Sequence, residues 1–174
     1  MGLDNLQDLF IEELRDVYSA EKQITKALPR MAKAASSPEL RNAFEQHLKV
    51  TEQQIARLEQ IFGELEMSPR GKKCKGMEGL LAEGKEMMAE DGEEAVIDAA
   101  LIAAAQRVEH YEIAAYGCIR NYANLLGLET AAKLLQETLD EEEETDALLT
   151  ELAEGGINTA ALAVGSDDED EGEE

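Results

Sequence analysis

Apolar residues recur at intervals of three or four positions along four long stretches of the chain. In the first stretch these positions are Leu6, Phe10, Leu14, Val17, Ile24, Leu28 and Met31. This spacing places the apolar side chains on one face of an α-helix, where neighbouring helices can bury them. The pattern predicts four long helices, at roughly 4–34, 38–64, 93–125 and 128–154.

Turn signals separate the predicted helices. Ser37 is expected to cap the second helix, with Pro38 at its first position. Gly127 marks the turn between the third and fourth helices, and Gly155 and Gly156 are expected to end the fourth. Because the links within each pair are short, the first two helices and the last two should form two antiparallel hairpins.

Residues 65–92 connect the two hairpins and contain one short helical stretch, near 77–89. A helix of about 28 residues is about 42 Å long, a distance that this connection can cover. The second and third long helices can therefore run parallel, joined by a long crossover. The sequence predicts an all-α protein, a ferritin-like four-helix bundle of two antiparallel hairpins with a long crossover between helices 2 and 3.

The composition limits the domain organisation and the partners. A chain of 174 residues is long enough for one domain with a substantial core. We expect the bundle to occupy residues 1–158 and an acidic, disordered tail to occupy residues 159–174. The net charge of −23 argues against a nucleic acid as partner, since a phosphate backbone would be repelled.

Several further features bear on where the protein works. No stretch approaches the roughly 20 uncharged apolar residues that span a membrane, and the acidic N-terminus does not resemble a signal peptide. Cys74 and Cys118 are isolated and lack metal-binding spacing, so they are expected to be reduced thiols of a cytoplasmic protein. The flat faces of two long hairpins lead us to expect a homodimer.

Three glutamates occupy positions on the apolar helix faces: Glu21, Glu112 and Glu142. Counting residues from the two turns places Glu21 level with Thr51 and Glu112 level with Glu142, near the middle of the bundle. An unpaired buried carboxylate is costly, and clustered carboxylates also repel one another. Such groups either stay protonated, with raised pKa values, or gather around cations. Cations are the interpretation that we favour here.

The spacing suggests a particular kind of metal site. A carboxylate-bridged dimetal site draws one Glu from each of two helices and a Glu-x-x-His pair from each of the other two. Glu21 and Glu112 fit the lone positions, and Glu142 with Asp146 resembles the paired helix, with Asp in place of His. Glu109, three residues before Glu112, is expected to be a further ligand or to contact a ligand.

The second helix supplies the fewest ligands. Its inner face has no glutamate, so Gln54 and His47 are the available donors, and a lone histidine there is more often a hydrogen-bonded core residue. Oxygen ligands with at most one imidazole favour iron or manganese over copper or zinc. A buried polar network with Arg or Lys is the alternative to metal. The predicted metal ligands are Glu21, Gln54, Glu109, Glu112, Glu142 and Asp146.

Seven segments of the chain carry a resemblance to a known family. They are DVYSAEKQ (16–23), ALPRMA (27–32), SPELRNAFEQHL (37–48), CKGMEGL (74–80), DAALIAAAQ (98–106), VEHYEIAAYG (108–117) and ETLDEE (137–142). Together they resemble the YciF-like stress-protein family, a ferritin-like family, over roughly residues 4–158. After His47 such proteins often carry an acidic pair, where this chain has Lys49 and Val50. The resemblance implies a ferritin-like bundle, a dimetal site and a link to stress responses.

The expected function follows from the ligand set and the resemblance. We expect a cytoplasmic stress-response protein that binds a dinuclear centre of iron, or of manganese, and that oxidises ferrous iron or reduces peroxide. Its expected partners are a second copy of the chain, metal ions, and peroxide or oxygen, with no nucleic acid and no membrane. The alternative is a non-enzymatic stress or interaction bundle with a degenerate metal site.

Overall fold

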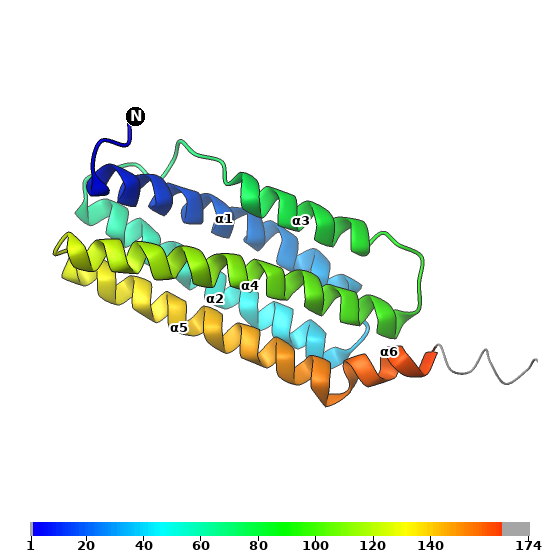
Figure 1. Cartoon of the computed structure of the whole chain (residues 1–174). Coiled ribbons are helices and arrows are strands. Elements are labelled where there is room, and N and C mark those ends of the chain that lie inside the picture. Colours follow the sequence, from blue (N-terminus) through cyan, green and yellow to red (C-terminus); the bar gives the residue numbers. More distant parts are fainter. Residues whose placement is uncertain (1, 165–174) are drawn as a thin grey trace, which may run out of the picture.

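A computed structural model describes residues 2–164, and all regular structure in this part of the chain is helical (Figure 1). The elements are α1 (Leu6–Ala34), α2 (Pro38–Glu64), α3 (Lys75–Met87), α4 (Glu94–Leu125), α5 (Glu129–Leu152), a π-helical turn (Ala153–Ile157) and α6 (Asn158–Val164). The all-α class is confirmed. The ends of the four predicted long helices differ from the observed ends by no more than two residues.

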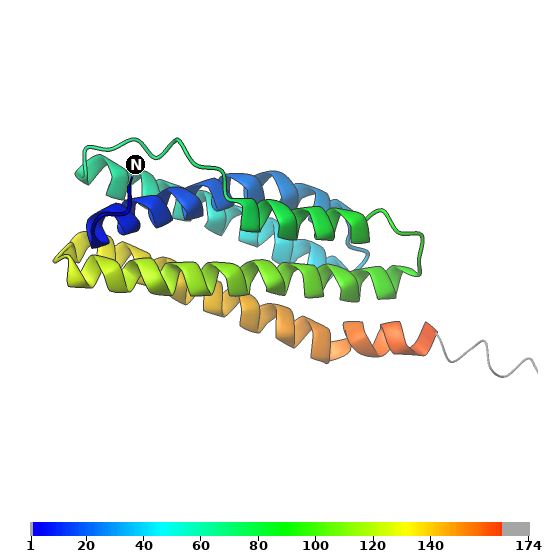
Figure 2. The same cartoon turned by 45° about the horizontal axis from the view of Figure 1, so that its top comes forward.

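The long helices form a four-helix bundle (Figures 1 and 2). Helices α1 and α2 run antiparallel, as do α4 and α5, and α2 runs in the same direction as α4. Helix α1 packs beside α4, and α2 packs beside α5. The connection between α2 and α4 returns along the whole bundle and carries α3, which lies on α1 and α4. The predicted ferritin-like arrangement of two hairpins and a long crossover is therefore confirmed.

Local signals account for where the helices begin and end. The Ser37 hydroxyl accepts a hydrogen bond from the Leu40 amide at 3.3 Å, and Pro38 opens α2, as predicted. Gly127 adopts a φ of 71° in the α4–α5 turn, a left-handed conformation that glycine tolerates without steric cost. Helix α5 ends at Leu152, and the helical dihedral angles break at Gly156.

The predicted start of the acidic tail falls inside α6. Residues Asn158–Val164 are helical and pack against α4, so the first part of the segment expected to be disordered continues the folded domain. Its alanines and Leu162 favour helix, and contact with α4 compensates for the short length of α6. The remainder of the predicted tail, residues 165–174, lies outside the described residues.

The core of the bundle consists of two apolar halves with polar residues between them. The half nearer the α1–α2 turn includes Ile24, Leu28, Leu40, Phe44, Leu101 and Leu149. The half nearer the α4–α5 turn includes Phe10, Leu14, Leu58, Phe62, Tyr116 and Leu135. Between the two halves lies a set of buried polar residues, here called the polar layer: Glu21, His47, Thr51, Gln54, Glu109, Glu112, Thr138 and Glu142.

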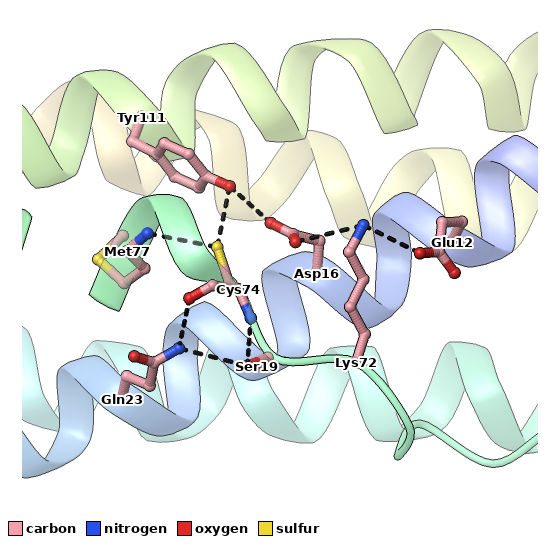
Figure 3. Close-up of polar contacts among 8 residues, drawn as sticks. All are labelled: Glu12, Asp16, Ser19, Gln23, Lys72, Cys74, Met77 and Tyr111. Atoms are coloured by element: carbon pink, nitrogen blue, oxygen red, sulfur yellow. Dashed lines mark hydrogen bonds and ion pairs between the residues drawn. The ribbon is translucent and has the colours of Figure 1, made fainter. Parts of the chain in front are cut away.

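The first turn of α3 is fixed to both α1 and α4 (Figure 3). The Cys74 amide donates to the Ser19 hydroxyl at 2.9 Å, and the Cys74 thiol lies 2.9 Å from the Tyr111 hydroxyl. Gly76 lies directly against the Tyr111 ring, because a Cβ added at Gly76 would come within 2.7 Å of Tyr111 Cε2. This ring cannot move away freely, since its hydroxyl also donates to Asp16 at 2.5 Å.

Two glycines of α3 provide a matched test of this packing. Gly76→Ala should lower the free energy of unfolding by about 1–3 kcal/mol, because the added methyl group overpacks the contact with Tyr111. Gly79→Ala has open space around its added Cβ and should raise the same quantity by about 0.5–1 kcal/mol through helix propensity. Urea unfolding followed by circular dichroism measures both changes. Equal stabilisation by the two variants would contradict the close α3–α4 contact.

Candidate metal centre

Four glutamates from three helices meet in the polar layer. Glu21 comes from α1, Glu109 and Glu112 from α4, and Glu142 from α5, and all four are 0% exposed. Glu109 and Glu112 are three residues apart and therefore share one face of α4. With Gln54 of α2, the layer thus holds five of the six residues that the sequence predicts as metal ligands.

His47 of α2 joins these glutamates. One ligand atom from each of His47, Glu109, Glu112 and Glu142 can be chosen so that all four atoms lie within 4.8 Å of one another. Two ligands on opposite sides of one ion, each about 2.0–2.2 Å away, lie about 4–4.4 Å apart, so this grouping is close to the size that one ion requires. The His47 Nδ1 atom lies 3.6 Å from Glu109 Oε1. The sequence identified His47 as an available donor but did not include it among the predicted ligands.

Most oxygen atoms of the four glutamates have no hydrogen-bond partner among the described residues. These are both oxygens of Glu109, Glu112 and Glu142 and the Oε2 atom of Glu21. The other Glu21 oxygen accepts a hydrogen bond from the Tyr116 hydroxyl. Buried polar atoms in folded proteins almost always have partners, so a group of unpaired carboxylate oxygens requires a specific explanation.

Burial dominates the electrostatics of the site. It raises the pKa values of Glu21, Glu109 and Glu112 well above their ordinary range, and repulsion from neighbouring glutamates adds to the effect. Burial also raises the pKa of Glu142, to about 7. The same cause lowers the pKa of His47 to about 4, so its imidazole is neutral at neutral pH. A neutral imidazole has a lone pair that a metal ion can bind.

A buried network with Arg or Lys, the alternative left open by the sequence, is not present. Among residues 2–164, no lysine or arginine makes an ion pair with the four glutamates of the layer. Arg57 instead binds Glu141, the neighbour of Glu142, through two hydrogen bonds of 2.6 Å each. The Arg57 guanidinium therefore pairs with Glu141 and touches the layer only through a hydrogen bond of 3.4 Å to Thr138.

Gln54 and Asp146, the two other predicted ligands, lie in different surroundings. Gln54 is buried in the layer, its amide donates to Glu141 at 3.2 Å, and its carbonyl oxygen has no partner among the described residues. Asp146 lies outside the group formed with His47: it accepts a hydrogen bond from Gln106 at 3.2 Å and lies 3.3 Å from His110 Nε2. His110 is exposed.

The donor set fits metal ions. Four carboxylates, one neutral imidazole and the free carbonyl oxygen of Gln54 form an oxygen-rich group of the kind that binds iron or manganese. Its unpaired oxygens are able to accept bonds from a cation. Thr51 and Thr138, also buried in the layer, add no charge.

Comparison with known proteins identifies relatives of the chain and of its fold. A family model described as a domain of unknown function (DUF892) matches residues 5–162. Protein YciF of Escherichia coli K12 is 48% identical over 162 residues, which cover 92% of this chain and 98% of YciF. The crystal structure of that E. coli stress protein matches with a TM-score of 0.86, over 89% of this chain and 98% of the solved chain.

Two further solved structures share the bundle. YcfI from Rhodopseudomonas palustris, whose description proposes a structural role, is 40% identical and has a TM-score of 0.83 over 85% of this chain and 94% of its own. A protein from Xanthomonas campestris is 25% identical, with a TM-score of 0.75 over 92% and 99% of the two chains. Among residues 2–164, none of the helices has the length and apolar character that crossing a membrane requires. The family match and the 48% identity together show that this chain belongs to the YciF-like family described as DUF892.

Proposed function

We propose that this protein binds two iron ions, or two manganese ions, in the polar layer and acts in a stress response by oxidising ferrous iron or reducing peroxide. The observation that carries this proposal is the set of seven unpaired, buried carboxylate oxygens of Glu21, Glu109, Glu112 and Glu142. The similarity to an E. coli protein described as a stress protein supports the biological role.

The charges of the layer support two ions rather than one. Four ionised glutamates carry four negative charges, which two divalent ions would balance, and the neutral His47 adds a ligand without adding charge. Protonation would remove charge and let Glu109 donate to Glu142, but each proton supplies one donor, which is fewer than the seven unpaired oxygens require. Binding of cations satisfies both requirements at once.

The chain's own residues orient the ligands and exclude water. Tyr116 donates to Glu21 and keeps its proton, because burial raises its pKa further above 10. This bond holds one Glu21 oxygen and leaves the other free. The apolar halves of the core close the layer from both sides along the bundle axis. When bound, two ferrous ions would supply the two electrons that, with two protons, reduce one hydrogen peroxide to two water molecules.

The proposal also includes the oligomeric state of the protein and its cellular compartment. The thiols of Cys74 and Cys118 are free, which supports a reducing compartment such as the cytoplasm. We also propose a homodimer that forms through the faces of the long hairpins. Sedimentation equilibrium would measure its mass.

The second candidate function is a non-enzymatic stress or interaction bundle with a degenerate site. Helix α2 supplies an imidazole and an amide to the layer but no carboxylate. This observation favours a degenerate site. The structural role proposed in the description of R. palustris YcfI points the same way for that protein.

Metal content distinguishes the two candidates. The wild-type chain, purified from iron-supplemented medium, should contain about two iron ions per chain. Glu112→Ala should lose most of this iron, because loss of a ligand costs more than the roughly 10–100-fold in affinity lost with an outer partner. Glu143→Ala, which alters an exposed glutamate next to Glu142, should keep it. Plasma mass spectrometry measures all three, and metal-free protein in every case would favour the non-enzymatic bundle.

The stability of the metal-free chain should depend on pH in a characteristic direction. The pKa values of the buried glutamates are higher in the folded state than in the unfolded state, so the folded protein binds more protons and loses stability as pH rises. For Glu142 the folding stability is lost between pH 4.5, its ordinary pKa, and about pH 7, its pKa in the folded protein. Each unit of difference in pKa costs about 1.4 kcal/mol.

Urea unfolding of the chelator-treated protein across this pH range tests the expectation. Glu142→Gln should reduce the loss of stability, whereas Glu143→Gln, one residue away and exposed, should leave the slope unchanged. Added metal should reverse the trend, because metal binding displaces protons from its ligands. A metal-free wild-type protein whose stability is constant from pH 4.5 to 7 would refute the electrostatic account of the layer.

A further inference from the structure

A cavity of about 270 Å³ opens between α2 and α5 beside the polar layer. Its outer lining includes the exposed residues Gln46, Glu144 and Leu148, of which Leu148 is 42% exposed. Its inner lining includes the buried residues Phe44, His47 and Leu149. The cavity therefore extends from the protein surface to the edge of the core.

His47 belongs both to this cavity and to the group of candidate metal ligands. Its Nδ1 atom is the nitrogen near Glu109, at 3.6 Å, whereas its Nε2 atom has no hydrogen-bond partner among the described residues. The residue is only 5% exposed. The Nε2 atom is itself buried, so the His47 ring stands between the inner end of the cavity and the carboxylates, and a molecule that enters must reach this ring first.

The lining indicates which molecules can enter. Much of the wall is apolar, with Phe44, Val50, Leu148 and Leu149 among its residues. Glu141 also lines the cavity, but its carboxylate is bound by Arg57 on both oxygens, at 2.6 Å each. A hydrated divalent cation would lose water against such a wall, although Glu144 at the mouth would attract it. A small uncharged molecule does not pay this cost of losing water.

We propose that this cavity is the entrance through which a small uncharged oxygen species, hydrogen peroxide or dioxygen, reaches the carboxylate cluster, and that His47 positions it at the inner end. The chemistry at the cluster rests on the function proposed above. The passage itself rests on the cavity and on the unpaired His47 nitrogen.

A bulky side chain at the mouth tests the passage. Leu148→Trp should obstruct it without touching the candidate ligands, and the exposed position should tolerate the larger ring. Leu125→Trp is the matched control, because Leu125 is 69% exposed at the end of α4 and does not line the cavity. Circular dichroism and iron content should be the same for both variants and the wild type.

The first readout needs no metal. Diethyl pyrocarbonate, a small uncharged reagent, modifies neutral imidazoles, and the chain has two histidines, His47 and the exposed His110. In chelator-treated protein, Leu148→Trp should slow modification of His47 about tenfold, an added barrier of about 1.4 kcal/mol. Modification of His110 should not change. Peptide mass spectrometry follows both sites in one sample, so His110 serves as an internal reference.

The second readout uses the iron-loaded chain and separates the two oxygen species. Oxidation of the bound ferrous iron is timed after adding hydrogen peroxide without oxygen, and after adding dioxygen alone. Leu148→Trp should slow the reaction of whichever species uses the passage about tenfold. Leu125→Trp should react like the wild type. Uptake of iron(II) by the metal-free variant should keep the wild-type rate.

The outcomes separate this inference from the function on which it rests. A wild-type chain that binds no iron would refute the proposed function. An iron-binding Leu148→Trp chain with unchanged His47 modification, or with unchanged oxidation by both species, would refute the passage alone. Slower iron(II) uptake with unchanged oxidation would show that the cavity admits the cation instead, which also overturns the inference.

Discussion

Four carboxylates buried in one layer of a helical bundle cannot all be ionised unless positive charge lies among them. Among residues 2–164 no arginine or lysine pairs with them, and Arg57, which lies on α2, binds Glu141 instead. The apolar halves of the core limit access of water from both sides along the axis. The negative charge of the four glutamates must therefore be compensated by protons or by bound cations. All four long helices contribute residues to this layer.

A second group of polar residues shows what the fold does with a carboxylate that it stabilises by itself (Figure 3). Burial alone would raise the pKa of Asp16, but hydrogen bonds from Cys74 and Tyr111 and the charge of Lys72 lower it. These contacts tie α1, the crossover and α4 together. Tyr111 immediately precedes Glu112, so the anchor also fixes α4 at the turn that directs Glu112 into the layer. The contrast between partnered Asp16 and the unpartnered glutamates indicates that the layer is arranged for an external partner.

Periodicity within one helix was sufficient to predict that Glu21, Glu112 and Glu142 are buried, because each interrupts a stripe of apolar residues. It was not sufficient for His47, since a histidine in such a stripe looks the same whether it packs in the core or faces Glu109 across the bundle. The spacing of Asp146 from Glu142 was suitable for a ligand, but Gln106 and His110 of α4 occupy its oxygens. Contacts between helices, rather than patterns within them, decide these cases.

The incomplete contribution of α2 and the cavity beside His47 have one common explanation. A metal ion held by fewer protein ligands keeps coordination positions for water or substrate, which is how catalytic sites differ from structural ones. Helix α2 supplies an imidazole and an amide where a carboxylate would complete the layer, and the cavity opens on this same side, between α2 and α5. The remaining glutamates are buried, and seven of their oxygens are unpaired among the described residues. This arrangement supports the proposed open site over the degenerate one.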